Sequence, residues 1–481
     1  MWTYITKRIL WMIPTFFAIS LIIFLILNLA PGKPGGTLAS GAEGQEASGS
    51  SRESYRVFKS QFNLDKPVLF NTRYALSDSQ VEKCLTNFAN ESGKVPMKEV
   101  IKSQELLEDY GQYSIPALIR ILKKSEGNQK FRAVVLETLV QNAQRYPINA
   151  YAEHLDDKTK QINNEIDKEN EEIRTFACSQ NASLKEQEKS AQKWYAWYKK
   201  HESRFKYSFG QKVGIFFTDT RFFKYWASLI RFDFGVSHID KKPVMGKILS
   251  KLQYSLCLSV PAVIFAYIIS VPLGVFSAVK QNSKFDRICA VILFMLYSLP
   301  SFFVATVLLY FFSQGGDFLK IFPTGGFQSP SVDSMTTWEK TKDIIWHIVL
   351  PLICMTYGSF ASLSRYARTG MLDVIRSDYV RTARAKGLSE FVVVVKHAMR
   401  NGMIPIITLL GTLLPVIIGG SVIIEYIFGI PGMGQLSITS IYNRDYNMIM
   451  GIQLISAILV LIGILISDLL YALVDPRISF K

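Results

Sequence analysis

Few residues in this 481-residue chain have the types and spacing that catalysis or metal binding requires. Five cysteines and five histidines are scattered along it with no CxxC pair, which predicts neither a metal site nor a thiol redox centre. No GxxxxGK[ST] loop is present to hold nucleotide phosphates, and neither GxSxG nor HExxH occurs. We therefore expect no catalytic residue, no metal and no cofactor in this chain.

The most informative polar segment is residues 365–401, RYARTGMLDVIRSDYVRTARAKGLSEFVVVVKHAMRN. Its pattern predicts a short amphipathic helix that Gly387 ends before a second helix begins. That helix would present Arg381, Arg384 and Lys386 to solvent. Basic side chains beside a bilayer also fix topology and contact anionic lipid, so charge alone does not assign the segment a function.

The elements that must position this segment are membrane helices. The chain is 49% hydrophobic and only 19% charged, below the roughly 25% charged residues of soluble domains. Its apolar residues gather in uncharged runs long enough to cross a bilayer, which needs about 20 residues as helix. We expect six such helices, at residues 9–32, 252–279, 288–316, 344–364, 401–424 and 446–467.

The distribution of Lys and Arg predicts the orientation of these helices. Residues 280–287 and 365–400 and both chain ends are rich in basic side chains. The two short loops on the other side carry only Lys320, Lys340, Lys342 and Arg444. We therefore expect both termini in the cytoplasm. Although the net charge is +15, this distribution points to membrane topology rather than to nucleic acid.

A long hydrophilic stretch separates the first two predicted spans, on the side opposite the termini. Residues 32–51 read as a flexible Gly/Ser/Ala-rich linker. From about residue 78 to 201 the pattern is helical, with one hairpin of the HEAT type at 115–140. We expect the WYAWY run at 194–198 to pack between this region and the membrane-proximal helices. Cys84 and Cys178 both lie in this external region, where the sequence allows either a disulfide between them or two free thiols.

Ordered motifs along the chain resemble the permease subunits of peptide/nickel-type ABC importers. The central one is DYVRTARAKGLSE at 378–390, followed by HAMRN at 397–401. The family's EAA-x3-G signature is reduced here to Ala383 and Gly387. Other resembling segments are residues 4–32, FNLDKPV at 62–68, RFDFGVSHIDKKPV at 231–244, SLPSFFVATVLL at 298–309, FPTGGF at 322–327, EYIFGIPGMGQL at 425–436, NRDYN at 443–447 and DLLYALVDPRI at 468–478.

The resemblance implies an all-α membrane protein with six transmembrane helices of the type I ABC importer permease kind. It divides the chain into residues 1–70 with the first helix and an external linker, a mainly helical extracytoplasmic insertion at 71–224, and a permease core at 225–481. The implied function is half of the translocation pathway of an ATP-driven importer in the inner membrane, with peptide as the expected substrate.

The resemblance also implies partners and site residues. The partners are a second, homologous permease, two ATPase subunits that bind ATP and Mg²⁺, and an extracytoplasmic solute-binding protein. The segment that docks on an ATPase comprises Asp378, Tyr379, Arg381, Thr382, Ala383, Arg384, Ala385, Lys386, Gly387 and Leu388. The external loop that faces the binding protein contributes Pro431, Gly432, Arg444 and Asp445.

Two other functions compete with the permease. A membrane-anchored sensor or scaffold would use the external region as its reader, but it should carry a cytoplasmic signalling domain, and the longest internal loop is short. A secondary transporter should show an inverted repeat and coupling-ion residues at mid-membrane, and the sequence shows neither.

Overall fold

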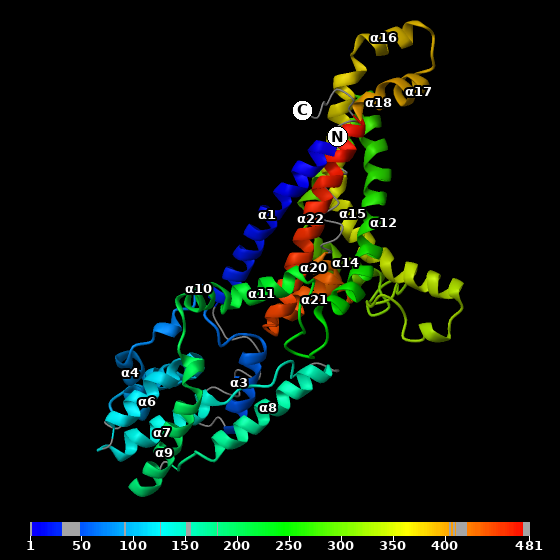
Figure 1. Ribbon diagram of the computed structural model, residues 1–481. Coiled ribbons are helices and arrows are strands. Elements are labelled where there is room, and N and C mark those ends of the chain that lie inside the picture. Colours follow the sequence, from blue (N-terminus) through cyan, green and yellow to red (C-terminus); the bar gives the residue numbers. More distant parts are fainter. Residues whose placement is uncertain are drawn as a thin grey trace. The chain divides into compact units, whose positions relative to one another are not determined.

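Helices supply the regular secondary structure of the computed structural model (Figure 1), as the sequence predicts. The structure describes residues 2–30, 49–90, 93–125, 127–150, 155–179, 181–403, 406, 409 and 421–474. Within these ranges no β-strand occurs, only isolated bridges at Val236–Pro243 and Ser313–Phe322. The chain forms two compact units, which we call the membrane unit (Met1–Pro34 and Phe234–Lys481) and the insert unit (Gly35–Asp233).

The membrane unit contains the long apolar helices. Its elements are α1 (Trp2–Leu29), α12 (Val244–Val279), α13 (Lys284–Ser298), α14 (Ser301–Phe312), η4 (Val332–Ser334), α15 (Thr337–Ile375), α16 (Asp378–Ala385), α17 (Glu390–Val392), the π-helical η5 (Val393–Ala398), α18 (Met399–Gly402), α20 (Val422–Ile427), α21 (Met433–Tyr442) and α22 (Tyr446–Val474). Among the described residues, α1, α12, α15 and α22 are each long and apolar enough to cross a bilayer. These four agree with four of the six predicted spans.

The other two predicted spans come out differently. The run at 288–316 is not one straight helix, because α13 and α14 meet at an angle of 94°. Leu299, the residue before Pro300, is extended, as a residue before proline prefers. Its carbonyl accepts a hydrogen bond from the Tyr357 hydroxyl at 2.7 Å. The predicted run at 401–424 lies largely outside the described residues. Of the six expected spanning helices, the described part of the chain therefore contains four single spans and one bent pair.

Helices α12 and α15 make the most extensive helix–helix contact in the described part of the membrane unit. Small side chains let the two helices approach closely, as is common between membrane helices. The Ser364 hydroxyl donates to the Ser270 carbonyl at 3.1 Å, and Ala367 is completely buried. Beyond this contact, Ala367 and Met371 of α15 pack with Val380 of α16 and Val393 of η5, so one apolar cluster joins α15 to the segment that follows it.

The insert unit is a bundle of shorter helices. They are α3 (Gly49–Gln61), η1 (Arg73–Ala75), α4 (Asp78–Ala89), α5 (Met97–Tyr110), η2 (Gly111–Ser114), α6 (Ile115–Lys124), α7 (Gln129–Ala143), α8 (Asp157–Arg174), α9 (Leu184–His201), η3 (Glu202–Phe205), α10 (Phe209–Thr218) and α11 (Arg221–Ile230). Capping boxes start several of them. Ser77 with Gln80 begins α4, and Ser183 with Glu186 begins α9. Helices α6 and α7 form the expected hairpin.

The core of the insert unit corrects the expectation for the WYAWY run. Trp194 and Trp197 of α9 are buried against Leu118 and Leu136 of the α6–α7 hairpin, so the run packs inside its own bundle. Their indole rings meet edge to face at 5.5 Å. Cys84 and Cys178 pack at the edge of the same core as free thiols, and burial raises the pKa of both.

The two ends of the predicted insertion lie side by side. Backbone hydrogen bonds join Asn71 N to Phe216 O at 3.0 Å, Arg221 N to Pro67 O at 2.9 Å and Phe222 N to Val68 O at 3.1 Å. The insert unit nevertheless begins before residue 71, because α3 packs into it. Phe58 of α3 is fully buried, and Lys59 of α3 pairs with Asp109 of α5 at 2.7 Å.

Candidate functional sites

The first candidate site is the segment from α16 through Gly387, which we call the Gly387 segment (residues 378–390). Figure 1 shows α16 and the loop to α17 projecting past the end of α15. One face of α16 is buried, with Val380 and Ala383 in the apolar cluster of Met371 and Val393. The opposite face is free, since the Asp378 side chain is 91% exposed. The segment is thus fixed on one side and open on the other.

Gly387 forms the turn after α16, as predicted. Its φ of +78° lies in the left-handed region that glycine adopts without strain, and its N–H bonds to Arg384 O at 3.0 Å. Arg384 then reaches across the turn, with its Nη2 2.6 Å and its Nε 3.1 Å from the two carboxylate oxygens of Glu390. Hydrogen bonding to Arg384 lowers the pKa of Glu390. A Cβ at position 387 would meet no atom within 4 Å, so the glycine serves the turn and not a close approach inside the chain.

The structure presents most of the predicted docking residues together. Of the ten predicted positions, only Ala383 is buried, and the other nine are exposed on this one projection. Tyr379 is also held, because its hydroxyl accepts a hydrogen bond from the Asn401 amide at 2.9 Å. The arrangement gives an exposed, mainly polar surface whose other side is packed on the membrane unit, which suits binding to another protein rather than chemistry on a small molecule.

The second candidate site is the loop around Glu425, where the carboxylate is completely buried. It accepts hydrogen bonds from the Ser255 hydroxyl at 2.7 Å and from the Gly434 N–H at 2.7 Å. Ser255 in turn accepts from the Met433 N–H at 2.8 Å. Burial raises the pKa of Glu425, and these hydrogen bonds oppose the rise. The motif at 425–436 was recognised in the sequence, but the role of Glu425 in organising the loop was not predicted.

A second buried carboxylate, Asp445, organises the start of α22. It accepts hydrogen bonds from the Ser237 hydroxyl, from His238 N at 3.0 Å and from Met448 N at 3.3 Å. The neighbouring Asn447 amide donates to Val236 O at 3.0 Å. Residues 236–238 are thereby fastened to α22. Burial lowers the pKa of His238 to about 4.

These contacts bear on the four residues expected to face a binding protein. Gly432 and Asp445 are buried, so their roles inside the fold are structural, and Pro431 is half-buried. Arg444 is exposed, and beside it lie the exposed apolar side chains of Ile441 and Tyr442. Sequence reasoning missed both; their signal was an aromatic and an aliphatic residue just before a charged turn.

An ion pair that the sequence analysis also missed joins α13 to α15. Asp286 is buried, and Arg368 contacts both of its carboxylate oxygens at 2.9 Å. Ser277 of α12 donates to the same carboxylate, as does the Asn282 N–H at 3.0 Å. Three helices therefore meet at one carboxylate, and its signal in the sequence was a lone acid at the start of an apolar run.

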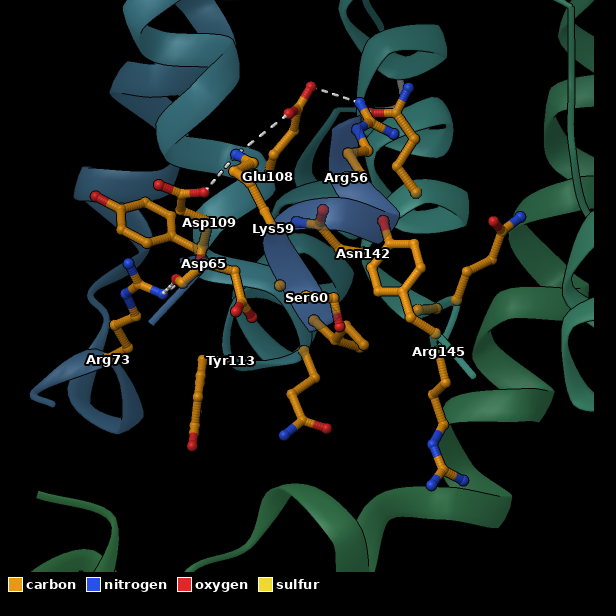
Figure 2. Close-up of a pocket in the computed structure, with 18 of the residues that line it drawn as sticks. Arg56, Lys59, Ser60, Asp65, Arg73, Glu108, Asp109, Tyr113, Asn142 and Arg145 are labelled. Atoms are coloured by element: carbon orange, nitrogen blue, oxygen red, sulfur yellow. Dashed lines mark hydrogen bonds and ion pairs between the residues drawn. The ribbon is translucent and has the colours of Figure 1, made fainter. Parts of the chain in front are cut away.

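The insert unit contains a cavity of about 250 Å³ beside α3, α5 and α7 (Figure 2). Its charged lining is Arg56, Lys59, Lys66, Arg73, Arg145 and Arg204 with Asp65, Glu108 and Asp109. Each of the three carboxylates has a cation within 3.2 Å, and Figure 2 shows Glu108 bonded to Arg56 and Asp109 to Lys59. The pairs of Arg56 and Lys59 fasten α3 onto α5, so these charges have a structural explanation. Within the described ranges, no three His, Cys, Asp or Glu side chains are placed to share a metal ion.

Comparison with known proteins agrees with the resemblance. Residues 270–480 match the family described as binding-protein-dependent transport system inner membrane component. The chain is 41% identical to the oligopeptide transport system permease protein AppB of Bacillus subtilis, over 54% of this chain and 80% of that protein. It is 38% identical to the peptidoglycan transport system permease protein YejB of Agrobacterium fabrum, over 54% and 72%. The dipeptide transport system permease protein DppB of Bacillus subtilis is 38% identical, over 53% and 77%.

At these identities, with most of each relative matched, the membership of this chain in the family is established. Its members are permease components of ABC transporters and not the ATPases, which agrees with the absence of a nucleotide-binding loop from the sequence. The apolar helices agree with a multi-pass protein of the inner membrane. The chain belongs to the binding-protein-dependent transport system inner membrane components, as a permease subunit of the peptide-type ABC importers.

Proposed function

We propose that this chain forms one half of the translocation pathway of an ATP-driven importer whose substrates are peptides. A second, homologous permease would supply the other half, two ATPase subunits would bind ATP and Mg²⁺, and an extracytoplasmic solute-binding protein would deliver the peptide. Support for the substrate class comes from relatives named for oligopeptide and dipeptide transport. Both termini would lie in the cytoplasm, in line with the distribution of Lys and Arg.

The observation that carries this proposal is the projecting Gly387 segment, which has one face built into the membrane unit and the other open. We propose that its open face docks on an ATPase subunit. Because Val380 and Ala383 pack on Met371 of α15, a force on α16 would pass directly into a membrane-spanning helix. Closure of the ATPases would then tilt α15 and, through the contact at Ser364 and Ser270, also α12.

The insert would act outside the membrane as a modulator of delivery. Its two ends lie side by side at Asn71 and Phe216, which is how a domain enters a loop without displacing the flanking chain. Arg444, with Ile441 and Tyr442, would contribute to the surface that receives the binding protein.

A reconstituted importer tests the proposal. The chain, its partner permease and the ATPases are placed in proteoliposomes, and uptake of labelled peptide is measured with binding protein outside and ATP inside. We expect uptake to need every component. A cysteine at position 381 should also form a cross-link to an ATPase subunit, whereas one at the buried Ala383 should not. Uptake without ATPases, or cross-linking at neither position, would contradict the proposal.

A further inference from the structure

Helices α10 and α11 of the insert unit leave apolar side chains in solvent. On α10, Phe209 is 84% exposed and Phe217 is 54% exposed, with the exposed Val213 between them. These three residues are four apart, so they share one face of the helix. On α11, Phe223 and Ile230 are exposed in the same way. Basic side chains flank this apolar surface at Lys212, Lys224 and Arg231.

Phe232, just after the end of α11, exposes a further phenyl group. Asp233 N bonds to Ser228 O at 3.0 Å and Phe232 N bonds to Leu229 O at 2.9 Å, which is the Schellman pattern of a helix end. The residue at the left-handed position of that pattern is usually glycine or asparagine, but here it is Phe232, with a φ of +57°. Its side chain is 73% exposed. Positive φ is strained for so bulky a residue, so the fold maintains an exposed phenyl at an energetic cost.

Chain connectivity keeps Phe232 within two residues of the membrane unit. Phe232 is two residues before Phe234, which is buried in the membrane unit, so the two Cα atoms are at most about 7 Å apart. The next residue, Gly235, accepts a hydrogen bond from Val244 N, where α12 begins. Val236 O accepts one from Asn447, in the first turn of α22.

We propose that α10, α11 and Phe232 lie flat in the interface of the bilayer at this end of α12 and α22, with Phe209, Phe217 and Phe232 among the lipid headgroups and upper acyl chains. An amphipathic helix with aromatic residues on one face and basic residues at its margin has the composition that binds such an interface, reaching about 5–10 Å into it. The occupant of the apolar face is lipid, and its contact anchors the insert unit to the membrane surface.

Spin-label accessibility tests the proposal on the full chain. The five native cysteines are replaced, and single cysteines at Phe217 and Ile230 are labelled with a nitroxide in nanodiscs of 3:1 phosphatidylcholine and phosphatidylglycerol. A label at Lys212, a basic residue at the margin of the apolar face of α10, is the matched control. Collision rates are measured with oxygen, which concentrates in lipid, and with a nickel chelate, which stays in water. We expect the ratio of oxygen to nickel collisions to be several-fold higher at 217 and 230 than at 212.

Two outcomes would overturn the proposal. Equal ratios at all three positions would show that the helices stand in water. Low collision rates with both reagents at 217 and 230 would show that protein covers the face, either a partner subunit or another part of this chain. Because the side chains of Phe217 and Ile230 are exposed, their replacement should not disturb the fold, and peptide uptake by each variant provides a check on folding.

Discussion

The carboxylate of Glu425 occupies the space that a side chain at position 432 would need. A Cβ on Gly432 would lie 2.4 Å from Oε2 of Glu425, the same oxygen that accepts the Gly434 N–H at 2.7 Å. Since a Cβ atom does not approach another heavy atom within 3.0 Å, the Glu425 carboxylate or the backbone would have to move. The glycine of this loop is therefore required by a buried acid that lies seven residues before it.

We predict that Gly432→Ala lowers the free energy of unfolding by about 1–3 kcal/mol, the usual effect of forcing a methyl group into a filled space. Thermal unfolding of the purified chain in detergent measures it. The matched control is Gly358→Ala in α15, where a Cβ would meet no atom within 4 Å. Equal stability of the two variants would contradict the tight contact between Gly432 and Glu425.

His238 predicts a loss of stability in acid. Burial lowers its pKa to about 4 from an ordinary 6.5, with Asp445 opposing the shift and Lys241 adding to it. Above pH 6.5 the histidine is neutral in both states; as the pH falls from 6.5 towards 4, only the unfolded chain takes up the proton, so the folded state loses stability. At pH 5 the loss should be about 2 kcal/mol relative to pH 7.

Thermal unfolding of the parent chain and of His238→Gln, each at pH 7 and pH 5, measures how much His238 contributes to the loss of stability in acid. The variant should lose less stability between the two pH values than the parent chain. The parent chain, measured in the same buffers, is the control. An unchanged pH dependence in His238→Gln would mean that the histidine accepts its proton in the folded chain.

Asp286 should be far more important to stability than an exposed carboxylate of the same kind. Asp286→Asn removes the buried charge that faces Arg368 at 2.9 Å and leaves the half-buried guanidinium without its counter-ion. We expect a loss of about 1–3 kcal/mol, the usual cost of leaving a largely buried polar group without its hydrogen-bond partner. Asp378→Asn is the control, because its pair with Arg381 is exposed and should contribute no more than about 1 kcal/mol. Similar melting temperatures for both variants would contradict this.

The sequence predicted the helical fold because the signal of each span is local. An uncharged run is visible without knowing its neighbours, and α1, α12, α15 and α22 occupy the expected positions. Pro300 is expected to bend or interrupt its helix, but the angle of 94° between α13 and α14 could not be predicted from the sequence. A proline does not say how far the chain turns, because other contacts, such as the hydrogen bond from Tyr357 to Leu299, decide whether a bent form is stable.

The candidate sites divide in the same way. The turn at Gly387 was predictable because a glycine between two amphipathic stretches is a local signal, and its φ of +78° agrees. The roles of Glu425 and Asp445 were not, because their partners are distant in sequence: Ser255 is 170 residues from Glu425, and Ser237 is 208 from Asp445. Such pairs become visible only when the helices are assembled.

Replacement of Gly387 tests the docking surface. A bulky side chain at a φ of +78° is strained, and Trp would also add bulk to the exposed turn. Gly387→Trp should therefore reach the membrane in normal amount yet uncouple ATP hydrolysis from transport. Gly387→Asn is the control, because asparagine tolerates the left-handed conformation and is small. We expect it to keep most of the uptake. Normal uptake by the tryptophan variant would show that this segment does not dock on an ATPase.

Removal of the insert distinguishes modulation from structure. Asn71 N and Phe216 O are 3.0 Å apart, so a short Gly/Ser linker can replace residues 72–215 while the bonds of Pro67 and Val68 to α11 remain. Shortening a loop changes its closure entropy by only about 0.6 kcal/mol per halving of its length, so the permease should still fold.

We expect the shortened chain to co-purify with its partner permease and to import peptide more slowly. The full-length chain, prepared from the same membranes, is the control for both measurements. Loss of the partner permease would show instead that the insert is needed for assembly, and would refute its role as a modulator of delivery.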